Sequence, residues 1–212
     1  MKQKNKNLEK IYQNAIKNES FNKAINIFEN YTKIATSESI FFNLGFLYDR
    51  RALQRKNYKR KHQDEKSALT YYKRAFALNK KFLPAILGLT RIYSRWKNPR
   101  AFVYAKKLYK ITKDKSYYVY LGHVYHLFGK LKRAEFYYKK ALPLISQHYG
   151  IYYALSILYQ EMGKVKLSQL YAKKSINVFK KMSKKYKKSK VVKKYIQKLN
   201  LIIKNKSTRK NS

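Results

Sequence analysis

Two stretches of the sequence repeat each other at a fixed distance. Residues 118–141 read YVYLGHVYHLFGKLKRAEFYYKKA, and residues 152–175 read YYALSILYQEMGKVKLSQLYAKKS. Eight positions correspond, each displaced by 34 residues. Self-similarity at such a period is the signature of a repeat architecture, in which each repeat is one supersecondary unit. In the first stretch the corresponding positions are Tyr118, Leu121, Gly122, Tyr125, Gly129, Ala134, Tyr138 and Ala141.

This pattern resembles the tetratricopeptide repeat (TPR), which has a large residue, Leu-Gly, Tyr, a turn Gly, Ala, an aromatic residue and Ala in the same order. The resemblance implies two antiparallel helices per repeat, with small residues at their close approach and aromatic residues beside them. Gly129 and Gly163 fall at the turn between the two helices, where a permissive backbone is needed. The implied fold is all-α: a right-handed α-solenoid of antiparallel helix pairs with a C-terminal capping helix.

Five repeats are predicted over residues 5–182, and in the third of them Gly88 stands one residue out of register. A basic capping helix is predicted over 183–204, and a disordered tail over 205–212. An amphipathic helix at that place would cover the exposed face of the last repeat. The apolar residues that predict it recur at intervals of three and four: Val191, Val192, Tyr195, Ile196, Leu199, Ile202 and Ile203.

The second repeat contains an insertion. Its Gly45 and Ala68 are 23 residues apart, whereas the corresponding separation in the clean repeat is 12. The difference of 11 residues falls at about 50–66. Either a loop or a helical extension of both flanking helices accommodates it, and Asp64 is a candidate N-cap for the helix that follows.

The composition excludes several classes of site. The 212 residues include 51 Lys and Arg against 10 Asp and Glu, for a net charge of +41, and no cysteine. The lack of cysteine excludes disulfides, thiolate zinc sites and cysteine nucleophiles. No secretory signal is visible and no apolar run is long enough to cross a membrane, so we expect a cytoplasmic protein without a membrane span.

No arrangement of residues predicts catalysis or a cofactor. The chain has no Gly-rich phosphate-binding loop, and its acidic residues are scattered, so we expect a protein that is not an enzyme. His123 and His126 are three residues apart and can share a helix face, with Glu161 on the neighbouring repeat. Two histidines and a carboxylate can hold a metal ion. Because no further ligand is fixed by the sequence, polar residues lining a groove are the simpler interpretation.

In the TPR family the first helix of each repeat lines a concave face on which ligand peptides lie. The corresponding residues here are mainly aromatic, apolar or neutral, which suits an extended or helical peptide. The first hypothesis is therefore a non-enzymatic scaffold or adaptor that binds a protein segment. Its predicted groove consists of Phe42, Asn43, Phe46, Arg50, Tyr93, His123, His126, Tyr153 and Ile157, with Asp49, Ile86 and Thr90 beside them.

Positive charge is concentrated elsewhere. Residues 162–212 hold 18 Lys and Arg and no acidic residue, and the insertion is a second basic segment that includes Tyr58. Basic runs with an aromatic residue are typical of phosphate contact and base stacking, although a solvated surface or a genome-wide lysine bias also explains them. The second hypothesis is a sequence-tolerant RNA-binding or ribosome-associated protein. Its polyanion-binding residues are Arg51, Arg55, Lys56, Lys59, Arg60, Lys61, Lys180, Lys181, Lys184, Lys185, Lys187 and Lys188.

Overall fold

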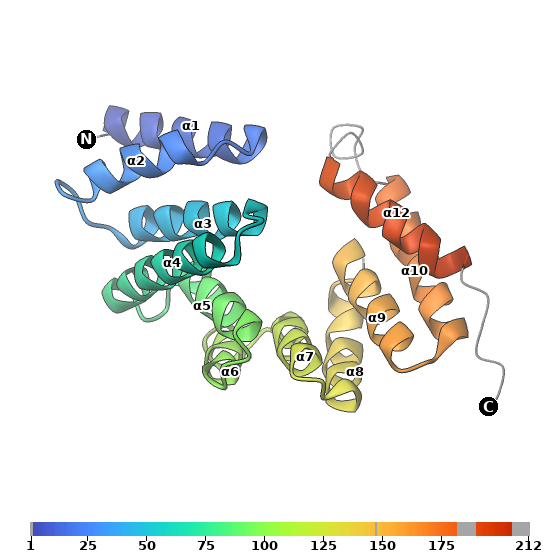
Figure 1. Ribbon diagram of the computed structural model, residues 1–212. Coiled ribbons are helices and arrows are strands. Elements are labelled where there is room, and N and C mark those ends of the chain that lie inside the picture. Colours follow the sequence, from blue (N-terminus) through green and yellow to red (C-terminus); the bar gives the residue numbers. More distant parts are fainter. Residues whose placement is uncertain (1, 147, 182–189, 205–212) are drawn as a thin grey trace. The chain divides into compact units, whose positions relative to one another are not determined.

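The computed structural model describes residues 2–146, 148–181 and 190–204, and within these ranges every regular element is a helix (Figure 1). The predicted all-α class is therefore confirmed. The chain divides into two compact units, Met1–Ile111 and Thr112–Ser212, and each is described by itself.

The first unit consists of consecutive helices joined by short turns. Buried leucine, alanine and tyrosine side chains form its core, with Leu44, Ala68, Tyr72, Leu89 and Ala101 fully covered. Ser37 begins the third helix, because its side chain accepts a hydrogen bond from the backbone N–H of Ile40. The helices are α1 (Lys2–Asn18), α2 (Asn22–Tyr31), α3 (Glu38–Gln54), α4 (Tyr58–Leu78), α5 (Leu83–Arg95) and α6 (Arg100–Thr112).

The insertion lengthens both α3 and α4, so it is a helical extension rather than a long loop. Three residues, 55–57, separate the two helices, which lie against each other (Figure 1). Asn57 caps α4 by accepting a hydrogen bond from the backbone N–H of Arg60 at 3.0 Å. The prediction that Asp64 caps this helix is wrong: Asp64 lies inside α4 and is buried.

Glycine and tyrosine pack against each other within the helix pairs. A Cβ atom at Gly45 would lie 2.9 Å from Cδ1 of Tyr72, and one at Gly122 would lie 2.5 Å from Cδ1 of Tyr138. Both rings are fully buried, so the small residue is what admits the large one. At the turns, Gly129 has a φ of +72°, a left-handed conformation that glycine adopts without strain.

The second unit ends in a helix that packs on the pair before it. Val192, Leu199 and Ile202 of this last helix are buried in a cluster with Ala172 and Phe179. The first part of the predicted capping helix, 183–189, and the predicted tail, 205–212, lie outside the described residues. The elements are η1 (Lys115–Tyr117), α7 (Tyr118–Leu127), α8 (Leu131–Ala141), η2 (Leu142–Leu144), α9 (Tyr149–Glu161), α10 (Val165–Lys181) and α12 (Lys190–Lys204).

Candidate interaction surfaces

An aromatic row crosses the first helices of the first unit. Phe42 and Phe46, one turn apart on α3, have ring centroids 5.9 Å apart. Phe46 is 6.1 Å from the ring of Tyr12 on α1, and Phe42 is 5.9 Å from the ring of Phe82 at the start of α5. All four rings are half-buried. Each ring is thus held by its neighbours while part of its surface faces solvent.

Two predicted polar residues lie on the same helix as this row. Asn43 and Arg50 are both half-buried on α3, and Arg50 follows Phe46 by one turn, which places it on the same side. The structure adds a cation that the sequence did not predict for this surface. The guanidinium carbon of Arg91 lies 5.5 Å from the ring centre of Phe46, within the range of a cation–π contact.

Several residues predicted for the groove are instead buried. Tyr93 is 3% exposed and stacks on Tyr104 of α6, with ring centroids 5.7 Å apart and an interplanar angle of 6°. Asp49, Ile86 and Thr90 are also buried. The prediction that these side chains line an open groove does not fit the structure. Most residues of α5 are buried, so little of this helix is open to a ligand.

Asp49 is the centre of a buried ionic network that the sequence analysis missed. The carboxylate, 1% exposed, accepts a hydrogen bond from Arg91 Nε at 2.6 Å, one from the Tyr72 hydroxyl at 3.3 Å, and a third from Arg95 Nη2. Arg95 Nε also donates to Glu65 Oε1 at 3.0 Å. Burial, reinforced by the Asp49 charge, raises the pKa of Tyr72 far above its ordinary value.

A second buried carboxylate engages two residues predicted to bind polyanions. Arg51 holds Asp64 through two hydrogen bonds, Nη2 to Oδ1 at 2.7 Å and Nε to Oδ2 at 3.0 Å. Arg55 Nε donates to the same carboxylate at 3.2 Å. Arg51 also donates to Asn22 Oδ1 at 2.9 Å. Both arginines therefore hold a buried carboxylate inside the protein. The only hint of this in the sequence is that two arginines stand four residues apart in a chain rich in lysine.

In the second unit the structure brings together two of the residues considered for metal binding. His126 Nε2 lies 3.0 Å from Glu161 Oε2, and His123 is exposed on the same helix, α7. No group of three or more His, Asp or Glu side chains with metal-binding geometry occurs in the described part of the chain. A polar surface pair is therefore the arrangement that this structure shows.

Tyr153 and Ile157 pack against α12. The ring of Tyr153 meets that of Tyr195 edge-on, with centroids 4.8 Å apart. Ile157 packs on the buried cluster that contains Leu199 and Ile202. These two predicted groove residues are half-buried and serve to attach the last helix, which reduces the surface that they offer a ligand.

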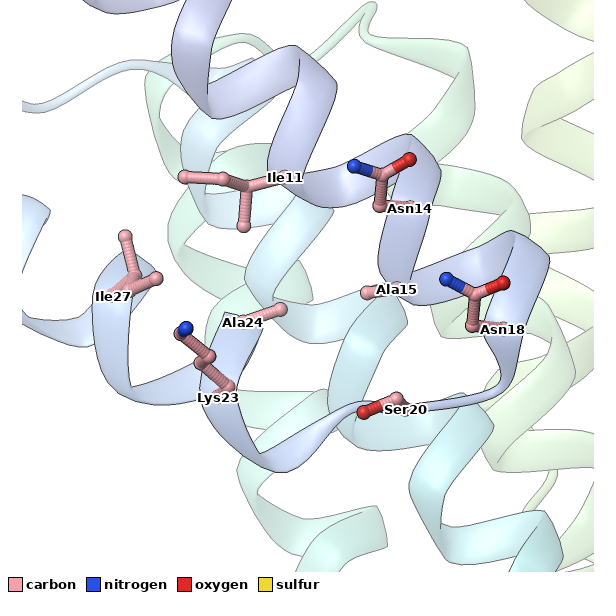
Figure 2. A pocket seen from close by; sticks show the side chains of 8 residues that line it. All are labelled: Ile11, Asn14, Ala15, Asn18, Ser20, Lys23, Ala24 and Ile27. Carbon is pink, nitrogen blue, oxygen red and sulfur yellow. The ribbon is translucent and has the colours of Figure 1, made fainter.

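A small pocket of about 230 Å³ lies between α1 and α2 (Figure 2). Its walls combine two amides, a hydroxyl and an ammonium group with isoleucine and alanine side chains, and include no carboxylate. Without a carboxylate, the lining offers no pair of acidic groups for acid–base chemistry. The lining residues are Ile11, Asn14, Ala15, Asn18, Ser20, Lys23, Ala24 and Ile27.

Comparison with solved structures decides the fold. A thermophilic TPR protein from Thermus thermophilus matches with a TM-score of 0.60 and 19% identity over 68% of this chain and 77% of that chain. A TPR protein from Parabacteroides merdae matches with a TM-score of 0.62 and 15% identity, over 92% of this chain and 83% of that chain. A chain of the APC/C hetero-tetramer Cut9–Hcn1 matches with a TM-score of 0.67 and 13% identity, over 93% of this chain and 36% of that chain. The chain has the TPR fold.

At these identities the likeness concerns the fold alone. No protein-family model matches the sequence, and no curated protein matches it. The TPR fold was predicted from the 34-residue period, and these comparisons confirm that prediction.

The remaining basic residues lie on the surface of the TPR helices. Lys56, Lys59 and Arg60 are exposed around the α3–α4 turn, and Lys61 is half-buried. Lys180 and Lys181 are exposed at the end of α10. Within the described ranges, no helix combines the length and apolar character that a membrane crossing needs. The other predicted polyanion-binding residues, Lys184, Lys185, Lys187 and Lys188, lie outside the described residues.

Proposed function

We propose that this chain is a non-enzymatic, cytoplasmic interaction scaffold that binds a peptide segment of a partner protein. The proposal takes residues 5–182 as five TPR-like repeats and α12 as their capping helix. The observation that carries it is the aromatic row of Tyr12, Phe46, Phe42 and Phe82. Rings already packed against one another lose little conformational freedom on binding, and partly exposed aromatic residues are common anchors of interfaces.

The chemistry around the row indicates the kind of peptide. An apolar side chain of the peptide would pack on Phe42 and Phe46. Asn43 offers both a hydrogen-bond donor and an acceptor, which matches a peptide backbone. The positive charge of Arg50 favours an acidic residue near the apolar anchor, whereas Arg91, over the ring of Phe46, is already paired with Asp49. In the second unit, His123 and the His126–Glu161 pair are the corresponding polar candidates.

Selection of peptides from a displayed random library on the whole chain, followed by fluorescence anisotropy, tests this function. Phe46→Ala should weaken the selected peptides by roughly 30-fold or more, as expected for an interface anchor. Arg50→Glu should weaken peptides that carry an acidic residue and leave the fold intact. The matched control is Lys106→Glu, which reverses a charge on an exposed position of α6. If both variants, Arg50→Glu and Phe46→Ala, bind the selected peptides as tightly as the wild type and have unchanged circular dichroism, the row is rejected as the binding surface.

A second candidate function is sequence-tolerant RNA binding. It is favoured by the exposed cations Lys56, Lys59 and Arg60, none of which takes part in an ion pair within the described part of the chain. Lysine contacts phosphate as a point charge and reads no base sequence. Anisotropy of labelled mixed-sequence RNA should therefore show a steep linear decline of log affinity with log salt concentration. Absence of binding at low salt would reject this function.

A further inference from the structure

The turn between α3 and α4 carries a cluster of three aromatic rings, the outermost of which is exposed. Tyr58, the first residue of α4, is 79% exposed. Its ring is parallel to that of His62, one turn later, with centroids 6.1 Å apart and an interplanar angle of 2°. His62 in turn lies 5.2 Å from the ring of Trp96 at the end of α5. We call these three residues the aromatic platform.

The inner end of the platform is fixed to the core. Trp96 Nε1 donates a hydrogen bond to Glu65 Oε2 at 2.7 Å, and Glu65 is only 5% exposed. The other oxygen of that carboxylate accepts from Arg95. The indole is therefore held in one orientation by a charge-assisted hydrogen bond, and the outer ring, Tyr58, leaves most of its surface to solvent.

The exposed charged side chains that flank Tyr58 in the sequence are all cationic. Lys56, Lys59 and Arg60 flank Tyr58 in the sequence and are exposed. The nearest acidic residues in the sequence, Asp64 and Glu65, are buried and already paired with arginines, so they do not neutralise these cations. Exposed Glu19 lines a pocket with Gln54 and Arg55 at the end of α3. The first turn of α4 adds the positive end of a helix dipole.

We propose that the aromatic platform binds bases of single-stranded nucleic acid, with Lys56, Lys59 and Arg60 contacting the phosphates. The proposal rests on the second candidate function and names the surface that performs it. A base stacks on Tyr58 only if it is unpaired, which excludes a regular duplex. An acidic peptide would satisfy the cations but would not use the ring face, and a single exposed ring gives little area for insertion into a lipid surface.

Trp96 provides a local probe, because it is the only tryptophan of the 212 residues. A labelled oligouridine of about 12 nucleotides covers the site size of one single-strand binding module. Its titration at low salt should change the fluorescence of Trp96 with the same midpoint as the anisotropy of the label. Duplex RNA of equal length, polyglutamate and phosphatidylserine vesicles are run beside it.

Tyr58→Ala should weaken oligouridine binding by roughly 5- to 150-fold, the range for loss of one stacked base, while Tyr58→Phe should bind like the wild type. Lys59→Gln with Arg60→Gln should lower the slope of log affinity against log salt by about 1.4. The matched control, Lys106→Gln with Lys110→Gln, removes the same charge from exposed positions of α6.

The outcomes separate the two ideas. No oligouridine binding by the wild-type chain would overturn both the RNA function and the platform. Binding that persists in Tyr58→Ala, or that leaves Trp96 fluorescence unchanged, would overturn the platform alone. Duplex RNA, polyglutamate or vesicles that bind as tightly as oligouridine and equally in Tyr58→Ala would also overturn it.

Discussion

Gly88 on α5 makes room for the ring of Tyr72 on α4. A Cβ atom at position 88 would lie 2.6 Å from Cζ of that ring, closer than side-chain carbons approach one another. Because Gly45 meets the other end of the same ring, Tyr72 lies between glycines of two successive helix pairs. Gly88, which stands one residue out of the repeat register, is thus the residue of α5 that faces the tyrosine of the preceding pair.

Gly88→Ala should therefore destabilise the protein. Alanine in a helix interior normally gains about 1 kcal/mol over glycine, so without a clash the variant would be more stable. Overpacking of a filled core costs about 1–3 kcal/mol. We expect this cost to outweigh the gain, because the Tyr72 ring is held on both sides and cannot move away from the added methyl group. Urea unfolding followed by circular dichroism should show a lower midpoint, and an unchanged or higher midpoint would contradict the packing argument.

The tyrosines Tyr72 and Tyr138 occupy matching places but differ in their hydroxyl groups. The hydroxyl of Tyr72 bonds to Asp49 and Arg91, whereas the hydroxyl of Tyr138 is the one buried side-chain polar atom without a hydrogen-bond partner in the described residues. Tyr72→Phe should cost about 1–3 kcal/mol, because it removes bonds to charged groups. Tyr138→Phe should be neutral or stabilising. Paired unfolding curves of the two variants test this, and equal losses would contradict it.

The Asp49 network should be among the most sensitive sites in the first unit. Asp49→Ala leaves Arg91 and Arg95 without their shared carboxylate, and breaking a buried pair in this way costs about 3–5 kcal/mol. Arg95→Lys should also destabilise, because a single ammonium group cannot span Asp49 and Glu65 as the guanidinium does. Thermal unfolding measures both losses, with Lys106→Ala on the α6 surface as the control that should stay within about 0.5 kcal/mol of wild type.

A half-buried tyrosine with a raised pKa, Tyr12, should make the fold sensitive to alkaline pH. Burial, with a contribution from Glu9, raises the pKa of Tyr12 from 10.0 to about 12. A pKa raised in the folded state contributes stability that is complete below pH 10, and that stability is lost as the pH rises toward 12. The near-ultraviolet absorbance of tyrosinate should therefore rise later in the folded protein than in urea. Tyr12→Phe should reduce the loss of stability over this interval, and coincident titrations in both states would contradict the prediction.

The sequence predicted the features that depend on local periodicity. The 34-residue recurrence predicted the helical class, the TPR fold and the turn glycines Gly129 and Gly163, because each reflects packing within one helix pair. Two members of the aromatic row, Phe42 and Phe46, also follow from this register, because they are one turn apart on the same face of α3. Tyr12 and Phe82 were not predicted for this surface.

Features that join distant positions could not be predicted in this way. Arg95 and Asp49 are 46 residues apart, and no period relates them. Tyr93 was predicted to face a groove from its helical phase, but Tyr104 of α6 covers it. Tyr153 was predicted likewise, and Tyr195 of α12 lies against it. Helical phase gives the direction of a side chain, whereas the neighbour that covers it depends on the tertiary structure.

Arginine and lysine occupy different kinds of position in the first unit, and this has a chemical consequence. In the described part of the first unit, the buried carboxylates Asp49, Asp64 and Glu65 are held by guanidinium groups, and the exposed positions around the α3–α4 turn include Lys56 and Lys59. Acetylation neutralises lysine and leaves arginine untouched. The charge of the exposed lysines at this turn can therefore be removed by a reversible modification that leaves the ion pairs of the buried carboxylates unchanged.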